Sequence, residues 1–397
     1  MEKKNEYPVV AEVSTEPPGP VDKYVRTPHD LTDVVSSFSR EPLVAVDTEA
    51  ASFHRYRDRI YLVQLSTPSE TAIIDPLAVA DLDPLGTLLS DSQVEKVLHD
   101  ADYDLRTLDR DYGFRATNIF DTRIAAQLSG EQAIGLAALL QKYLGIVLRK
   151  EHQKADWSRR PLPPEMLAYA AADTRHLPAL RESLRSRLIE LGRLSWAEEE
   201  FHRAESLRWT GGDADSADSE EAYQKIKGAK ALSPRQLAAL REVHRWREAL
   251  AAEQDRATFR IIGNDALLAV STALPRTRSA LLQTSGLPQS LAHRYEPALL
   301  AAVERALRLD DASLPRFSRP ARRPKDATLD ALVERLKAAR TQVAAQLGLD
   351  PGVLCGRTAL EAVARAHPVS RAELEQVSEL RNWQVDVLGE ALLAAIQ

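Results

Sequence analysis

Short apolar runs separated by polar turns mark the first part of the chain. The runs "LVAVDTE" (43–49) and "IYLVQLST" (60–67) are joined by the polar turn "ASFHRYRDR", and together they predict the two strands of a hairpin. The segments "TAIIDPL" (71–77) and "VEKVLHD" (94–100) predict two further strands. Helical patterns mostly follow these strands, so we expect a mixed sheet with helices packed on it.

Helical periodicity is found between residues 81 and 192. Gly113 is the expected stop of one helix, and two later helices are each expected to end at a glycine. Pro178 should interrupt or kink the last and longest helical region. The expected helical segments are 81–91, 101–113, 120–130, 135–145 and 163–192.

The chain after residue 220 has an almost purely helical pattern. Ser233 followed by Pro234 is typical of the N-cap and first position of a helix. Two segments without periodicity, one acidic and one basic and Pro-rich, are typical of linkers. We therefore expect a disordered tail at 1–22, an α/β domain at 23–208, a linker at 209–219, a helical domain at 220–300, a linker at 314–327 and a helical domain at 328–397.

The bulk composition narrows the class of protein. With 397 residues the chain is too long for one typical core, and its net charge of −6 gives no global basic signature, so a nucleic-acid site would need local patches or metal ions. The single cysteine, Cys355, excludes a disulfide framework and favours the reducing cytoplasm. The N-terminal residues lack the apolar core of a signal peptide, and no apolar run approaches the length of a membrane span, so we expect no membrane partner.

Two carboxylates continue the first apolar run. Asp47 and Glu49 are two residues apart, so on a strand they point to the same face. Such a pair is common in a chain with 58 acidic residues, and it is usually a solvated edge or turn. Here it follows a buried strand directly, and crowding like charges there is costly unless a positive group compensates.

A second acidic cluster, at the expected strand-to-helix junction near residue 100, contains Asp100, Asp102 and Asp104. Capping of the helix N-terminus and its favourable dipole explain one or two of these acids. Asp104 is spaced four residues from Leu108, so it could instead border the core.

Further along the chain, Tyr169 and Asp173 are spaced to lie one above the other on a helix, with three alanines between them. The alternative is a tight packing face with Asp173 at its rim. That alternative does not explain why an acid should lie on the tight side beside a tyrosine.

Together these segments offer four carboxylates and no matching cluster of basic residues. All-oxygen ligands in that number suit hard cations such as Mg²⁺ or Mn²⁺. Two such ions could activate a water and stabilise the leaving oxygen of a phosphodiester, with Tyr169 placed to hydrogen-bond that water. If so, the carboxylates should be crowded and not paired with arginines, and at least one pKa should be raised.

The motifs "DTE" (47–49), "HDADYD" (99–104) and "YAAAD" (169–173), with "KADWSRRPLPPEMLAYAAADTRHL" around the last, resemble the ribonuclease D family of DEDDy 3′–5′ exonucleases over residues 23 to 208. The resemblance implies an α/β RNase H-like fold and hydrolysis that releases nucleoside 5′-monophosphates. It implies that Asp47 bridges two metals, that Glu49 and Asp173 complete the ligand shell of the first metal and that Asp104 serves the second metal. Tyr169 would orient the attacking water.

The helical part resembles HRDC modules, most clearly over 232–271 and more loosely after 328. Residues 220–295 carry more basic than acidic residues, which suits phosphate contact, although a solvated helix face is the plainer alternative. The family implies a monomer that binds single-stranded 3′ ends of RNA and trims tRNA precursors. An exonuclease that prefers DNA and a non-catalytic nucleic-acid-binding protein are the alternatives.

Several further residues are expected at the substrate. The basic turn "HRYRDR" offers Arg55, Arg57 and Arg59 for phosphates, although a solvated hairpin tip explains them equally well. Trp157 and His152 could line the substrate end, and plain core packing is the alternative for Trp157. Gln64 and His99, within the segments that resemble the family, complete this set.

Overall fold

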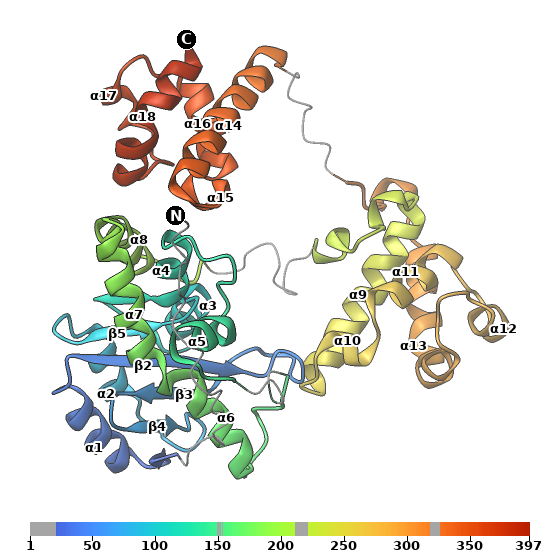
Figure 1. Ribbon diagram of the computed structural model, residues 1–397. Coiled ribbons are helices and arrows are strands. Elements are labelled where there is room, and N and C mark those ends of the chain that lie inside the picture. Colours follow the sequence, from blue (N-terminus) through green and yellow to red (C-terminus); the bar gives the residue numbers. More distant parts are fainter. Residues whose placement is uncertain (1–20, 149–151, 153, 211–220, 318–325) are drawn as a thin grey trace, which may run out of the picture.

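The computed structural model describes residues 21–148, 152, 154–210, 221–317 and 326–397 (Figure 1). The expected tail at 1–22 and the acidic linker therefore lie almost entirely outside the described residues. Part of the basic linker does so too.

A six-stranded mixed sheet organises the first part of the chain, in the order β1-β4-β3-β2-β5-β6. β2 and β3 form the expected antiparallel hairpin, whereas β2 pairs in parallel with β5. The strands are β1 (Lys23–Val25), β2 (Leu43–Ala50), β3 (Ile60–Ser66), β4 (Thr71–Ile74), β5 (Glu95–Leu98) and β6 (Ile119–Asp121). The prediction of a mixed sheet with flanking helices is confirmed.

Helices cover both faces of this sheet because successive residues of β2 point to opposite sides. Val44 and Val46 pack with α1, α2 and α3, whereas Ala45 packs with α4, α5, α7 and α8 on the other face. α6 covers the same face beside them, over β3 and β4. These helices are α1 (Pro28–Phe38), α2 (Asp83–Ser90), α3 (Asp102–Tyr112), α4 (Thr122–Leu128), α5 (Leu136–Leu144), α6 (Pro164–Arg175), α7 (Leu177–Glu190) and α8 (Leu194–Ala204).

Local signals set most helix ends as expected. Gly113 and Gly145 adopt left-handed backbone conformations at the ends of α3 and α5. Pro178 separates α6 from α7, since it lies in the first turn of the second helix. The helix expected at 120–130 is wrong at its start: Phe120 and Asp121 belong to β6, and Asp121 then caps α4 through the amides of Arg123 and Ile124.

The remaining described elements are helical. Ser233 caps α9 in a reciprocal box with Gln236, as its sequence position predicts. α13 runs on beyond residue 300, and α14 begins at Ala327, so both helices cross the expected domain limits. The helices are α9 (Pro234–Glu253), α10 (Thr258–Ile261), α11 (Asn264–Ala273), α12 (Arg278–Leu282), α13 (Gln289–Leu307), α14 (Ala327–Leu347), α15 (Pro351–Leu354), α16 (Arg357–Ala366), α17 (Arg371–Leu374) and α18 (Asn382–Ile396).

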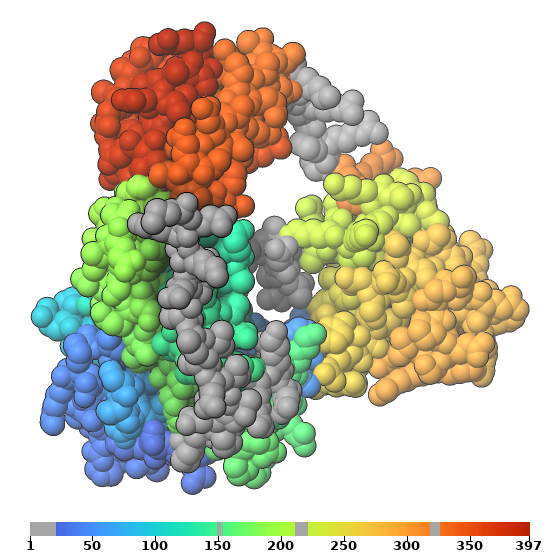
Figure 2. Space-filling view, in the orientation of Figure 1, coloured from blue at the N-terminus to red at the C-terminus, as the bar shows by residue number. Residues whose placement is uncertain are grey.

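The two helical units contact the sheet domain at separate places, and Figure 2 shows open space between the three parts. α9–α13 lie against the connection between β2 and β3, whereas α14–α18 pack on α4 and α8 (Figure 1). Within the described part of the chain, no helix combines the length and apolarity needed to cross a membrane.

Candidate active site

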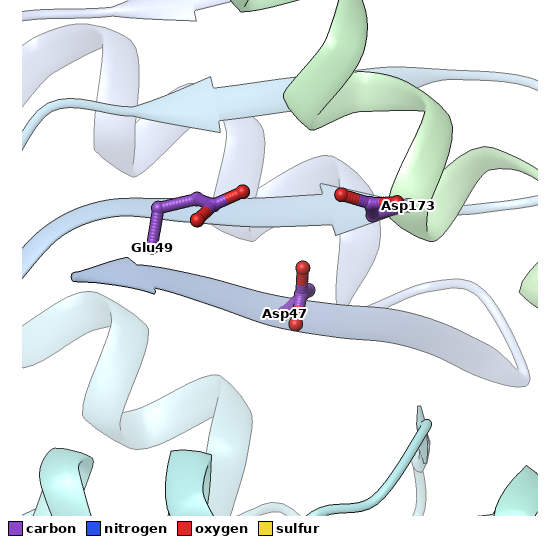
Figure 3. Close-up of side chains that lie close together, drawn as sticks. All are labelled: Asp47, Glu49 and Asp173. Atoms are coloured by element: carbon purple, nitrogen blue, oxygen red, sulfur yellow. The ribbon is translucent and has the colours of Figure 1, made fainter. Parts of the chain in front are cut away.

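Three carboxylates converge on one face of the sheet. Asp47 and Glu49 project from β2, and Asp173 reaches them from α6 (Figure 3). One oxygen from each carboxylate lies within 4.8 Å of the others, a spacing that fits a shared metal ion. The sequence prediction that these three acids meet agrees with this geometry.

α6 approaches the sheet closely because its contact face is made of small residues. Ala170 and Ala171 are fully buried against Leu62 and Ile73 of the sheet. The alanines thus form the tight packing face that was the alternative explanation for this segment. Tight packing and a place for Asp173 in the acidic cluster are compatible, because the same close approach brings Asp173 to the acids of β2.

Tyr169 lies one helical turn before Asp173, and aromatic rings fix its position. The ring of Trp157 stacks on it with centroids 6.2 Å apart, and the ring of His152 meets it edge-on at 5.6 Å. Trp157 is 1% exposed, so the core-packing alternative is correct for this residue. A contact between Trp157 and substrate stays a prediction, since protein side chains cover the ring in this structure.

Asp104 approaches β2 from the opposite layer of helices and is not one of the three acids whose oxygens lie within 4.8 Å of one another. β2 pairs with β5 only up to Ala45, so the edge of β2 beyond that point is open to the start of α3. Thr48, which points away from the other two acids, donates a hydrogen bond to Asp104. Thr48 was not among the residues predicted for the site, although its position between two acids on a strand was the available signal.

The cluster is electrostatically unfavourable without a cation. Burial, and then the charge of Asp173, raise the pKa of Asp47 to about 8, and burial raises that of Asp173 to about 7. Burial also raises the pKa values of Glu49 and Asp104, with neighbouring carboxylates adding to the effect. Among the described residues no arginine or lysine pairs with Asp47 or Glu49, so the raised pKa values agree with the sequence expectation.

A buried amide beside the cluster adds to this picture. Gln64 lies directly opposite Asp47 in the register of β2 and β3, so both side chains share one face. It is 0% exposed, and neither atom of its amide has a hydrogen-bond partner in the described protein. Buried polar atoms normally have partners. Gln64 and the carboxylates therefore fit a site that receives a hydrated divalent cation.

The other residues expected at the substrate have different surroundings. Arg57 and Arg59 are exposed, and Arg59 lies over the ring of Tyr61. His99 is half-buried and contacts Thr122 at 2.9 Å, and burial lowers its pKa to about 4, so it is neutral at physiological pH. A role in substrate binding stays a prediction for each of these side chains.

Arg55 lies in a contact between domains. Its guanidinium donates to Ser158 at 2.6 Å and to Asp255, in the turn after α9, at 3.3 Å. Tyr56 packs into the core of the first helical unit. The alternative of a solvated hairpin tip is therefore wrong for this part of the turn, because helical residues cover it.

Comparisons with known proteins agree with this geometry. The family model described as 3′-5′ exonuclease matches residues 23–189, and the HRDC domain model matches residues 236–303 and 330–396. Ribonuclease D of Desulfotalea psychrophila is 32% identical over 83% of this chain and 87% of its own. Ribonuclease D of Gluconacetobacter diazotrophicus is 31% identical over 95% and 93%. The crystal structure of Escherichia coli RNase D, described as an exoribonuclease involved in structured RNA processing, has a TM-score of 0.66 at 26% identity over 94% of this chain and 98% of that one.

The mixed sheet, the acidic cluster and the helical modules define a 3′–5′ exoribonuclease whose acidic cluster suits a divalent metal. The chain belongs to the ribonuclease D family. The resemblance inferred from the three motifs is confirmed.

Proposed function

We propose that this exoribonuclease trims the 3′ ends of tRNA precursors and other structured RNAs, using two divalent cations, Mg²⁺ or Mn²⁺. The observation that supports it most is the convergence of Asp47, Glu49 and Asp173 within 4.8 Å on an apolar sheet. Asp47 would contact both ions, Glu49 and Asp173 would hold the first, and Asp104 would serve the second. Bound ions of this kind lower the pKa of the attacking water and stabilise charge on the leaving oxygen.

The chain's own residues would orient the attacking water. Burial, and then the charges of Asp173, Glu49 and Asp47, raise the pKa of Tyr169, so its hydroxyl keeps its proton and can donate a hydrogen bond to the attacking water. That water adds to the last phosphorus while the bond to the preceding 3′ oxygen breaks. The products are a nucleoside 5′-monophosphate and a chain shortened by one nucleotide with a new 3′ hydroxyl.

Within this proposal the exonuclease domain, residues 23–208, carries the chemistry, and the helical units at 220–300 and 328–397 contact RNA. We also propose that the protein acts as a monomer and that it works in the cytoplasm; the single cysteine supports the cytoplasmic location.

The test is incubation of the protein with a 3′-extended tRNA in Mg²⁺ and, separately, in Mn²⁺. We expect stepwise shortening and release of 5′-monophosphates, abolished by Asp47→Ala and unaffected by Glu165→Ala, an exposed acid of the same helix as Asp173. No shortening with either metal would reject the proposal. Faster degradation of a matched DNA strand would show that the enzyme prefers DNA to RNA.

A further inference from the structure

Two exposed phenylalanines meet where the exonuclease domain contacts the first helical unit. Phe53, in the connection between β2 and β3, is 45% exposed, and Phe259 of α10 is 54% exposed. Their rings pack edge to face with centroids 6.4 Å apart. Figure 1 shows the connection between β2 and β3 extending to α10.

Polar contacts join the two parts directly beside the rings. The amide of Ala257 donates to the carbonyl of His54 at 3.2 Å, and the Arg260 guanidinium donates to the carbonyl of Phe53 at 2.5 Å. A pair that served packing alone would be covered by the contact that it makes. About half of each ring instead remains open to solvent.

Each ring is accompanied by a cation. The ammonium of Lys154 lies 5.4 Å from the centroid of the Phe53 ring, and the guanidinium carbon of Arg260 lies 5.9 Å from that of Phe259. Neither cation pairs with an acid among the residues that the structure describes. Two acids close to them in sequence, Asp156 and Asp255, both face Arg55. The surface is therefore aromatic and positively charged; we call Phe53, Lys154, Phe259 and Arg260 the aromatic patch.

The aromatic patch lies close along the chain to residues of the candidate active site. Phe53 follows Glu49 by four residues, so the two Cα atoms are at most about 14 Å apart. Lys154 precedes Trp157 by three residues, and the ring of Trp157 supports Tyr169. A nucleic-acid strand whose 3′ end reaches the carboxylates would thus have the patch within a few nucleotides of its end.

We propose that the aromatic patch binds the single-stranded part of an RNA substrate just upstream of the nucleotide being removed. Phe53 and Phe259 would stack on bases, and Lys154 and Arg260 would contact the neighbouring phosphates. Stacking on aromatic side chains accepts any base, so the patch suits a processing enzyme that must remove 3′ extensions of differing sequence. This inference rests on the proposed RNA substrate and adds a contact outside the cleavage site.

The first experiment measures binding without cleavage. In an Asp47→Asn background, fluorescence anisotropy gives the affinity for an unstructured RNA oligonucleotide. Replacing both phenylalanines by leucine keeps apolar packing but removes the stacking faces, and we expect affinity to fall about tenfold or more. Replacing both by tyrosine should preserve it. The matched control is Ile189→Ala, since Ile189 is 50% exposed on α7 and has no role in the patch.

The second experiment separates stacking from a disturbed domain contact. Lys154→Gln leaves both rings and the backbone contacts in place, and it should weaken binding and reduce the slope of affinity against salt by about one. In the active enzyme, the leucine double variant should lose more activity on a long RNA than on a dinucleotide.

Equal binding by the parent and leucine variants, or an unchanged salt slope for Lys154→Gln, would overturn the proposed RNA-binding role of the aromatic patch. Neither result would contradict the proposed exoribonuclease function. A parent protein that neither binds nor shortens RNA would instead reject the proposed function.

Discussion

At the scale of single residues, the candidate site is defined by carboxylates that lack a counter-charge. Asp47 and Asp173 come from different elements, so neither could move away from the other without disturbing the strand or the helix. Burial raises the pKa of both and so favours their protonated forms, and the charge of Asp173 adds to the effect on Asp47. A bound divalent cation would reverse this preference, because it stabilises the ionised carboxylates.

This reversal predicts how stability depends on pH. The folded-state pKa values, about 8 for Asp47 and about 7 for Asp173, exceed the unfolded values near 4, so the folded protein holds more protons between those limits. In EDTA the contribution of these groups to stability is present below about pH 4 and is lost as pH rises through 7 and 8. Melting temperatures should therefore fall over this range in EDTA.

Divalent metal should act in the opposite direction. Adding Mg²⁺ or Mn²⁺ should raise the melting temperature strongly at about pH 8 and little at about pH 5, where protons compete for the carboxylates. A variant with Asp47→Asn and Asp173→Asn should show a flatter pH profile and a smaller metal effect. Equal metal-induced shifts at both pH values would contradict the assignment of the site.

Tyr169 can be separated from metal binding in a second test. Tyr169→Phe keeps the ring on Trp157 but removes the hydroxyl, so the metal-induced rise in melting temperature should remain. We expect kcat on RNA to fall about a hundredfold, the cost of losing one positioned hydrogen-bond donor. Tyr143→Phe is the control. The hydroxyl of Tyr143, on α5, donates a hydrogen bond to Glu131 and takes no part in the proposed chemistry. A normal rate for Tyr169→Phe would remove Tyr169 from the mechanism.

At the scale of elements, local sequence signals found most strands and helices but not the contacts between them. The hairpin of β2 and β3 followed from its apolar runs, and α9 followed from Ser233 and Pro234. β6 was missed because three residues carry too little periodicity to separate a strand from the helix that follows it. α1 and α8 were not singled out either, although Thr27 followed by Pro28 is a recognisable start of a helix.

The candidate site likewise combines residues that local patterns predict with contacts that only the fold creates. The acids of β2 and the pair on α6 were visible as local patterns, whereas the hydrogen bond from Thr48 to Asp104 joins layers that only the fold brings together. The contact of Arg55 with Asp255 joins residues that are distant in sequence. Phosphate binding was therefore the expectation for Arg55, since a basic turn read by itself shows no partner.

A double-mutant cycle decides which role Arg55 has. The structure places Arg55 between Asp255 and Ser158, beside the segment that carries Trp157, so it should act by holding the domain contact in place. Asp255→Asn suits this test because asparagine tolerates the left-handed backbone of that position (φ 43°). Arg55→Gln and Asp255→Asn should each lower kcat/KM a few-fold, and the double variant should lose little more than either one. Independent, multiplying losses would show instead that Arg55 binds phosphate directly.

At the scale of the whole molecule, the last helical unit shares a hydrophobic core with the exonuclease domain. Trp383 of α18 is 3% exposed, stacks on Trp196 of α8 at 5.0 Å and donates to Glu200 at 2.9 Å. Glu199 accepts the amides of Asn382 and Trp383, and so caps the start of α18. The unit is thus fixed to the exonuclease domain by packing and by satisfied polar groups, which keeps α14–α18 and the candidate active site in a constant arrangement.

Removing this anchor should release the unit. Trp383→Ala deletes the stacked ring and one buried hydrogen bond, a change that costs about 3–5 kcal/mol at a buried tryptophan. Small-angle X-ray scattering should then show a larger radius of gyration, and activity on a structured RNA should fall more than activity on a short single strand. Trp246→Ala is the matched control: this ring packs on Tyr295 inside the first helical unit, so its loss should destabilise that unit without detaching α14–α18. An unchanged radius of gyration for Trp383→Ala would show that the remaining contacts, among them the bridge from Arg193 to the carbonyls of Leu128 and Leu347, are sufficient to hold the unit in place.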